Sequence, residues 1–85
     1  MVSWIKYNNI CEGQFPGEVI ITFSTSKDEL TAIFPSSSID ESQQSFIAVV
    51  IGEKGDLYLV DLPNHTFKTG SRAWFPKESV ALAGG

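Results

Sequence analysis

Apolar and polar residues alternate along much of this 85-residue chain, the pattern of strands that bury one face. Residues 18–24 and 30–35 both show it, and a polar turn at residues 26–29 separates them. Their apolar faces consist of Val19, Ile21, Phe23, Leu30, Ala32 and Phe34. The pattern predicts a hairpin over residues 18–35.

The next apolar segment, Phe46 to Ile51, is apolar on both faces, which favours a central strand. A glycine-rich reversal at residues 52–56 leads into Leu57 to Leu62 and predicts a second hairpin. We expect Pro63 to end this hairpin, because proline has no N–H to donate to a ladder. Arg72 to Phe75 and Val80 to Leu82 are predicted as the last strand pair.

One short segment predicts a helical turn. Ser38 and Glu41 have the spacing of a capping box, so residues 39–44 are expected to form about one and a half helical turns. Near the N-terminus, Trp4 is interpreted as a residue of a terminal strand that packs against the edge of the fold.

A nine-residue segment occurs twice. Residues 31–39 read Thr-Ala-Ile-Phe-Pro-Ser-Ser-Ser-Ile and residues 72–80 read Arg-Ala-Trp-Phe-Pro-Lys-Glu-Ser-Val. Ala, Phe, Pro and Ser recur at the same places, and Ile39 corresponds to Val80. Phe can end a strand facing the core, and Pro then interrupts the ladder. We therefore expect two similar corners related by an approximate two-fold, although a chance match in a chain rich in Phe, Ser and Ala stays open.

Five or six short antiparallel strands with turns at regular intervals favour an all-β small barrel or sandwich over an α/β arrangement. A chain of 85 residues has room for one core, so residues 1–85 are expected to form a single domain.

The second corner also resembles the end of an SH3-like barrel. In that family a strand that closes in aromatic-Phe-Pro is followed by one 3₁₀ turn and a last strand that begins at Val, as in Gly70 to Val80 here. The groove proline of SH3 domains corresponds to Pro76, whereas the groove tyrosine is replaced by Ser79. The family's opening sequence and paired tryptophans are absent. The resemblance therefore implies an SH3-like corner rather than recognition of proline-rich peptides.

Few residues here suit catalysis or metal binding. Cys11 and His65 are the only cysteine and histidine, so a disulfide within the chain and a cysteine-based zinc site are excluded. We interpret Cys11 as a buried or half-buried thiol. The sequence contains no phosphate-binding glycine loop and no nucleophile elbow. These observations favour a protein that is not an enzyme and that needs no cofactor and no metal.

The charge is unevenly distributed. The net charge is −4, yet residues 62–85 carry Lys68, Arg72 and Lys77 against Glu78 alone. The acidic total disfavours binding to nucleic acid or to anionic membranes. No apolar run approaches the roughly 20 residues of a membrane span, and the N-terminus lacks the features of a signal peptide. The sequence predicts a cytoplasmic protein.

The second corner differs from the first where its side chains should face outward. Thr31, Ile33 and Ser36 correspond there to Arg72, Trp74 and Lys77. Arg and Trp are enriched at binding hot spots. We predict a partner-binding surface of Arg72, Trp74 and Lys77, with Lys68 and Phe67 at its margin. The alternative is that Trp74 is covered by the loop at residues 64–70 and that Arg72 is merely solvated.

Two function classes follow. The first is a non-catalytic protein-interaction module or an accessory subunit of a larger assembly, whose protein partner the sequence does not identify. The alternative is a small barrel that binds single-stranded nucleic acid through exposed aromatic and basic side chains. Self-association into a homo-oligomer is left open.

Overall fold

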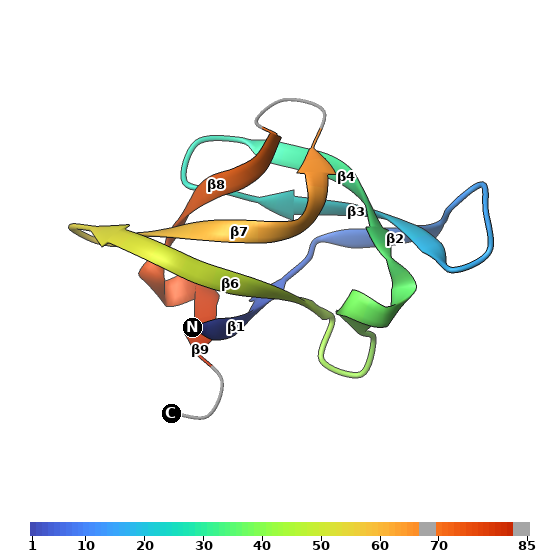
Figure 1. Cartoon of the computed structure of the whole chain (residues 1–85), viewed down its shortest axis with the longest axis horizontal. Coiled ribbons are helices and arrows are strands. Elements are labelled where there is room, and N and C mark those ends of the chain that lie inside the picture. The colour runs from blue at the N-terminus through green and yellow to red at the C-terminus, as the bar shows by residue number, and fades with distance from the viewer. Residues whose placement is uncertain (67–69, 83–85) are drawn as a thin grey trace.

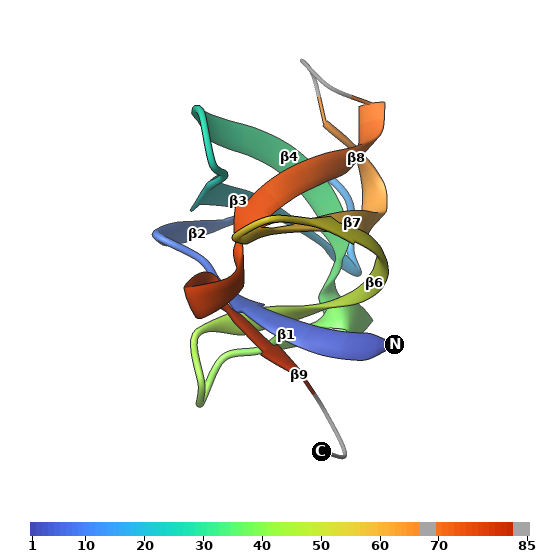
Figure 2. The ribbon, with the colours of Figure 1, turned by 90° about the vertical axis from the view of Figure 1, so that its left-hand side faces the viewer.

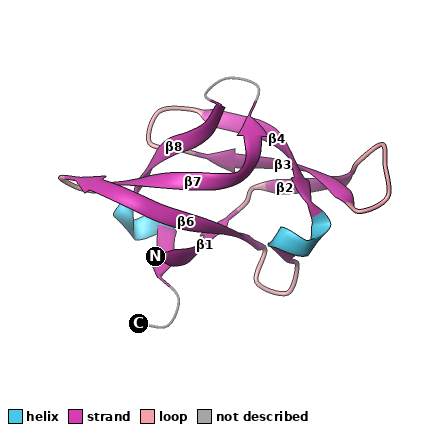
Figure 3. Ribbon diagram, viewed as in Figure 1, coloured by secondary structure: helices cyan, strands magenta, loops and turns pink. Residues whose placement is uncertain are grey.

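The computed structural model describes residues 1–66 and 70–82. This part of the chain contains strands and two single 3₁₀ turns but no α-helix (Figure 1, Figure 3). Its strands are β1 (Val2–Lys6), β2 (Asn9–Glu12), β3 (Glu18–Ser24), β4 (Glu29–Pro35), β5 (Ile39–Asp40), β6 (Ser45–Lys54), β7 (Leu57–Thr66), β8 (Gly70–Pro76) and β9 (Val80–Leu82). The 3₁₀ turns are η1 (Ser36–Ser38) and η2 (Lys77–Ser79). The prediction of an all-β fold is confirmed.

All strand pairs are antiparallel, in the order β2-β3-β4-β7-β6-β1-β9, while β5 pairs with β6 and β8 pairs with β7. Both views place β8 on one side of the molecule and β1 with β9 on the other (Figure 1, Figure 2). The β6–β7 hairpin turns at Gly55, whose φ of +59° suits the first central position of a two-residue turn.

Four buried phenylalanines form the centre of the core. Phe23 lies 5.8 Å from Phe34, 5.1 Å from Phe46 and 5.9 Å from Phe75, measured between ring centroids. Each of the four side chains is fully buried. Offset and edge contacts at these distances add to the free energy gained by burying the rings. Phe34 and Phe75 belong to the two repeated corners, so the repeat supplies half of this cluster.

The two corners have the same local structure. Pro35 has φ −61° and ψ 138°, and Pro76 has φ −57° and ψ 137°. In each, a serine hydroxyl donates back to the proline carbonyl, over 2.7 Å from Ser38 and 2.8 Å from Ser79. The amide after each proline also donates to the residue that precedes the partner strand: Ser36 to Gly17, and Lys77 to Asp56. The predicted repeat is therefore a structural one.

The two halves of the sheet are related by an approximate two-fold axis. Ile5 and Phe46 face each other across β1 and β6, and they are 41 positions apart, like Ala32 and Ala73. Ile39 then pairs with Phe46 on one side, and Val80 pairs with Ile5 on the other. One row of core residues thus crosses β5, β6, β1 and β9. Ile39, which follows the first corner, ends the row on β5, and Val80, which follows the second corner, ends it on β9.

The predicted helical turn at residues 39–44 is wrong. Ile39 and Asp40 form β5, and residues 41–44 form a turn instead. The capping box does not form, because the Ser38 hydroxyl already bonds to Pro35. Packing Ile39 into the core row outweighs the local helical signal.

Two strand predictions also need correction. β7 does not end at Pro63 but continues to Thr66. Pro63 lies where the pairing of β7 with β8 shifts register, between Asp61 and Thr66, and where β7 pairs with β6 no longer. The missing N–H therefore costs no ladder bond. The last two strands do not pair with each other either: β8 pairs with β7, and β9 with β1.

We expect Phe34→Ala and Phe75→Ala each to lower the free energy of unfolding by about 3–5 kcal/mol, because each removes a fully buried ring. Phe15→Ala is the control, since the side chain of Phe15 is 66% exposed. Urea denaturation measures all three. A loss below about 1 kcal/mol at either corner would contradict the proposed core.

Candidate functional site

The outer face of β8 carries the predicted site. Ala73 and Phe75 are buried, so alternation along the strand turns Arg72 and Trp74 to the outside. Arg72 is exposed, and Trp74 is half-buried. Across the β7–β8 pair, Asp61 faces Arg72 and Leu59 faces Trp74.

Trp74 lies in an open groove of about 600 Å³, lined also by Ser26, Lys27, Lys54, Asp56 and Leu57. The Ser26 amide donates to the Trp74 carbonyl over 2.9 Å, which holds the β3–β4 turn against β8. Neither Lys27 nor Lys54 forms an ion pair with any residue that the structure describes. The groove therefore combines an aromatic wall with two available ammonium groups.

Arg72 and Lys77 differ in how firmly they are held. The Arg72 guanidinium lies 3.8 Å from an Asp61 carboxylate oxygen, and the two side chains are 65% and 45% exposed, so this ion pair is weak. Lys77 is bonded to Glu53, and its ammonium lies 5.0 Å from the centre of the Tyr58 ring. The hydrogen bond to Glu53 is the largest cause that raises the pKa of Lys77. Arg72 is the more available cation.

The two predicted marginal residues, Phe67 and Lys68, lie outside the described residues. The proposed cover of Trp74 by residues 64–70 is therefore only partly described: Asn64 and Thr66 belong to β7. Tyr58 is half-buried against the core.

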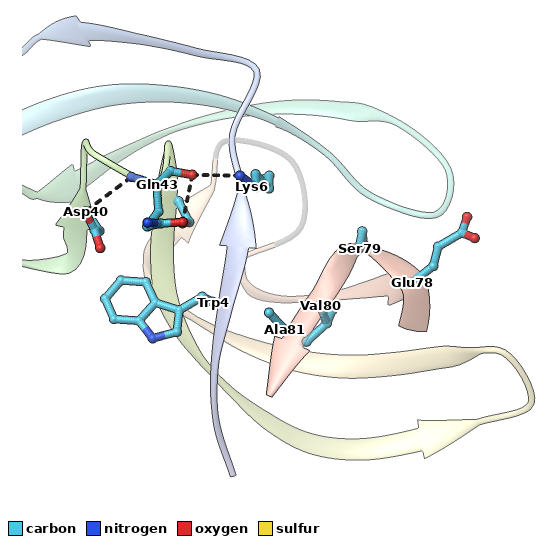
Figure 4. Close-up of a pocket in the computed structure, with 9 residues that line it drawn as sticks. Trp4, Lys6, Asp40, Gln43, Glu78, Ser79, Val80 and Ala81 are labelled. Carbon is cyan, nitrogen blue, oxygen red and sulfur yellow. Dashed lines mark hydrogen bonds between the residues drawn. The ribbon is translucent and has the colours of Figure 1, made fainter. Parts of the chain in front are cut away.

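A second groove, which the sequence did not predict, lies beside β1 and β9. It measures about 420 Å³, and its lining includes Trp4, Asp40, Ser45, Glu78 and Ala81 (Figure 4). Trp4 and Asp40 lie on the same side of β1, whereas Glu78 extends from the other side. These residues are far apart in the sequence, and only the pairing of β1 with β6 and β9 brings them together.

Asp40 organises the turn at the edge of this second groove. Its carboxylate accepts the Ser42 hydroxyl at 2.6 Å and the amides of Ser42 and Gln43 at 3.1 and 3.3 Å. The Ser42 hydroxyl is the largest cause that lowers the pKa of Asp40. Nearby, burial first and then the charges of Glu41 and Asp40 raise the pKa of Tyr7. This end of the molecule is electrostatically negative.

Other candidate chemistry is sparse. Cys11 is exposed, which corrects the expectation of a buried or half-buried thiol. It lies on β2, an edge strand whose Ile10 faces the core, so alternation turns Cys11 outward. Among the described residues, no group of His, Cys, Asp and Glu side chains is arranged to hold a metal ion. The described residues also include no helix that could cross a bilayer.

No family model, curated protein sequence or solved structure matches this chain. The interpretation of both grooves therefore depends on their own geometry and charge.

We expect Ser42→Ala to raise the pKa of the Asp40 carboxyl towards its ordinary value, because the substitution removes the 2.6 Å hydrogen bond. A carboxyl whose pKa is lowered by folding stabilises the fold when it is ionised. This contribution is present at neutral pH and is lost as the pH falls through the pKa of the folded state. Carboxyl ¹³C NMR titration measures the shift, with Ser37→Ala as the control. An unchanged Asp40 titration would show that the Ser42 bond is not formed.

Proposed function

We propose that this chain is a non-catalytic protein-interaction module that binds an acidic segment of its partner in the groove beside Trp74. The observation that carries the proposal is the half-buried Trp74 between Lys27 and Lys54, with Arg72 on the same face. A tryptophan supplies a large apolar contact, and unpaired cations attract carboxylates and orient them.

The repeat supports this assignment by comparison. At the equivalent outward positions of the first corner stand Thr31 and Ile33. Both corners have the same backbone geometry, so the fold does not require arginine and tryptophan at the second. Selection for binding is a sufficient reason for the difference. The SH3-like assignment stays a prediction, which the strand, proline, 3₁₀ turn and strand of each corner support.

Single-stranded nucleic acid is the alternative ligand, since it too would use an aromatic side chain and cations. The same groove contains Asp56, and Asp61 faces Arg72 across the strand pair. With a net charge of −4, the chain lacks the broad positive field that binds phosphates. A protein partner with a few well-placed carboxylates fits this mixed surface better.

We expect Trp74→Ala and Arg72→Ala each to weaken partner binding by about 1–3 kcal/mol, as for other hot-spot residues, while the melting temperature changes little. The probes are 12-residue peptides selected from a random display library on the wild-type chain, and calorimetry measures their affinity. We expect these peptides to contain Asp or Glu beside an apolar residue. Thr31→Ala and Ile33→Ala, at the equivalent positions of the first corner, are the matched controls.

Lys77→Ala should weaken binding less than either of these substitutions, because Lys77 already pairs with Glu53. Peptides that bind Trp74→Ala as tightly as wild type would contradict the proposed groove. A fluorescent 12-residue oligothymidine that binds the wild type in low salt, but not Trp74→Ala, would favour nucleic acid instead. Unfolding of Trp74→Ala, together with unchanged binding by Arg72→Ala, would assign Trp74 to the core.

A further inference from the structure

Exposed apolar side chains gather at one part of the surface. Large hydrophobic residues that are exposed comprise Met1, Val2, Phe15, Val49, Ile51 and Leu82. All but Phe15 belong to β1, β6 or β9 or, in the case of Met1, directly precede β1. Such a concentration on a small protein marks an interaction surface rather than scattered exposure.

Two of these exposed residues, Val2 and Val49, form an apolar strip on the outer face together with the half-buried Trp4 and Ile47. Val2 faces Val49 across β1 and β6, and Trp4 faces Ile47 two residues further along. Ile5 and Phe46, beside them, are buried, so alternation turns the four side chains outward. We call Val2, Trp4, Ile47 and Val49 the β1–β6 strip. Val2 and Val49 are 45% and 40% exposed.

The strip lies between two hollows. At the Trp4 end is the groove of about 420 Å³, and at the other end is a hollow of about 200 Å³ lined by Val2, Val49 and Pro63. Together they give an elongated surface with an apolar centre. Such a surface accommodates a polypeptide segment better than a flat patch does, since projecting side chains can enter both ends.

The charges around the Trp4 end are mostly acidic. Asp40, Glu41 and Glu78 form no ion pair with any described residue, although Asp40 holds its own turn. Lys6 is the cation nearby, and its ammonium donates to the Gln43 carbonyl over 3.0 Å. A partner cation placed over the Trp4 ring would meet both the aromatic face and the Asp40 carboxylate.

We propose that the β1–β6 strip is a second docking surface, which binds a partner polypeptide segment that places apolar side chains on the strip and a lysine or arginine against Trp4 and Asp40. Its charge preference is opposite to that of the Trp74 groove, and the two surfaces are centred on different strands, β1 and β6 for the strip and β8 for the groove. The proposal does not depend on the Trp74 groove. If both hold, the chain bridges two different partners.

A second copy of this chain is a weaker occupant of the strip. A symmetric dimer would place like surfaces together. If the two-fold axis runs along the strip, Asp40, Glu41 and Glu78 of the two copies approach each other, and with any axis the two chains each carry a net charge of −4. A partner with basic side chains avoids this repulsion.

The test uses two ten-residue peptides that share valines at alternate positions and carry either lysine or glutamate at the others. Each is titrated into the isotope-labelled full-length chain, and the amide and indole NMR signals are followed. We expect the lysine peptide to shift signals of β1, β6, β9 and the Trp4 indole, and the glutamate peptide to leave them unchanged. A lysine peptide that shifted mainly β8 signals would overturn the proposal, and it would also count against the acidic preference of the Trp74 groove.

Two substitutions separate the apolar and the charged contributions. Val49→Ser removes exposed apolar area, and Asp40→Asn removes the charge but keeps the oxygen that accepts the turn hydrogen bonds. Each substitution should lower the affinity for the lysine peptide by about three- to tenfold, which corresponds to roughly 0.7–1.4 kcal/mol of binding free energy. Phe15→Ser, which alters the exposed apolar residue outside this surface, should not change the affinity.

Three results would overturn the proposal. The first is equal affinity for the two peptides, and the second is unchanged affinity of both Val49→Ser and Asp40→Asn for the lysine peptide. The third is concentration-dependent dimerisation in sedimentation that Val49→Ser abolishes, because the occupant would then be a second copy.

Discussion

The fold depends on how the chain leaves a strand at a Phe-Pro pair. The phenylalanine ends the strand facing inward, and the proline then interrupts the ladder while one 3₁₀ turn carries the chain to the next strand. Phe34 and Phe75 contact Phe23 from the two corners, and Ile39 and Val80 complete the core row on β1 and β6. Both corners form the same hydrogen bonds, so the same local structure occurs twice in the fold. A core of this size leaves little spare stability, so each corner matters.

Comparison of the two corners also distinguishes residues that build the fold from residues that form the surface. Residues that the corners share are buried or make the corner's own hydrogen bonds, as with Ala32, Ala73, Ser38 and Ser79. Arg72, Trp74 and Lys77, which replace Thr31, Ile33 and Ser36 of the first corner, form the basic, aromatic side of the molecule. The acidic and apolar surface at β1 and β6 has a different origin, since it lies where the two halves pair. A small domain can thus present two chemically distinct surfaces without enlarging its core.

Much of this could be predicted from local pattern. Alternation located the β3–β4 hairpin and β6, and the repeated Phe-Pro pair located both corners. Prediction failed where the local structure is decided by contacts between residues that are distant in the sequence. Ser38 resembled a helix cap but bonds to Pro35, and Pro63 resembled a strand end but lies where no ladder bond is required. The exposure of Cys11 was not predicted, because no strand was predicted at residues 9–12, where β2 forms an edge of the sheet.

The candidate sites also contain some residues that local pattern could predict and others that only the fold brings together. Arg72 and Trp74 lie two positions apart on one strand, so alternation sufficed to predict that they share a face. Lys77 was grouped with them because it is close in sequence, whereas its contacts with Glu53 and Tyr58 come from the neighbouring hairpin. The groove at Trp4 joins residues from three separate segments, and no local signal identifies it.

One variant tests most directly whether shared residues build the fold and differing residues bind. Arg72→Thr, Trp74→Ile and Lys77→Ser together replace the basic and aromatic side chains of the second corner with the corresponding side chains of the first. We expect this triple variant to fold, with a melting temperature within about 8 °C of wild type, and to bind the peptides selected on wild type at least about 100-fold more weakly. A triple variant that fails to fold, or that folds and binds these peptides as tightly as wild type, would contradict the account.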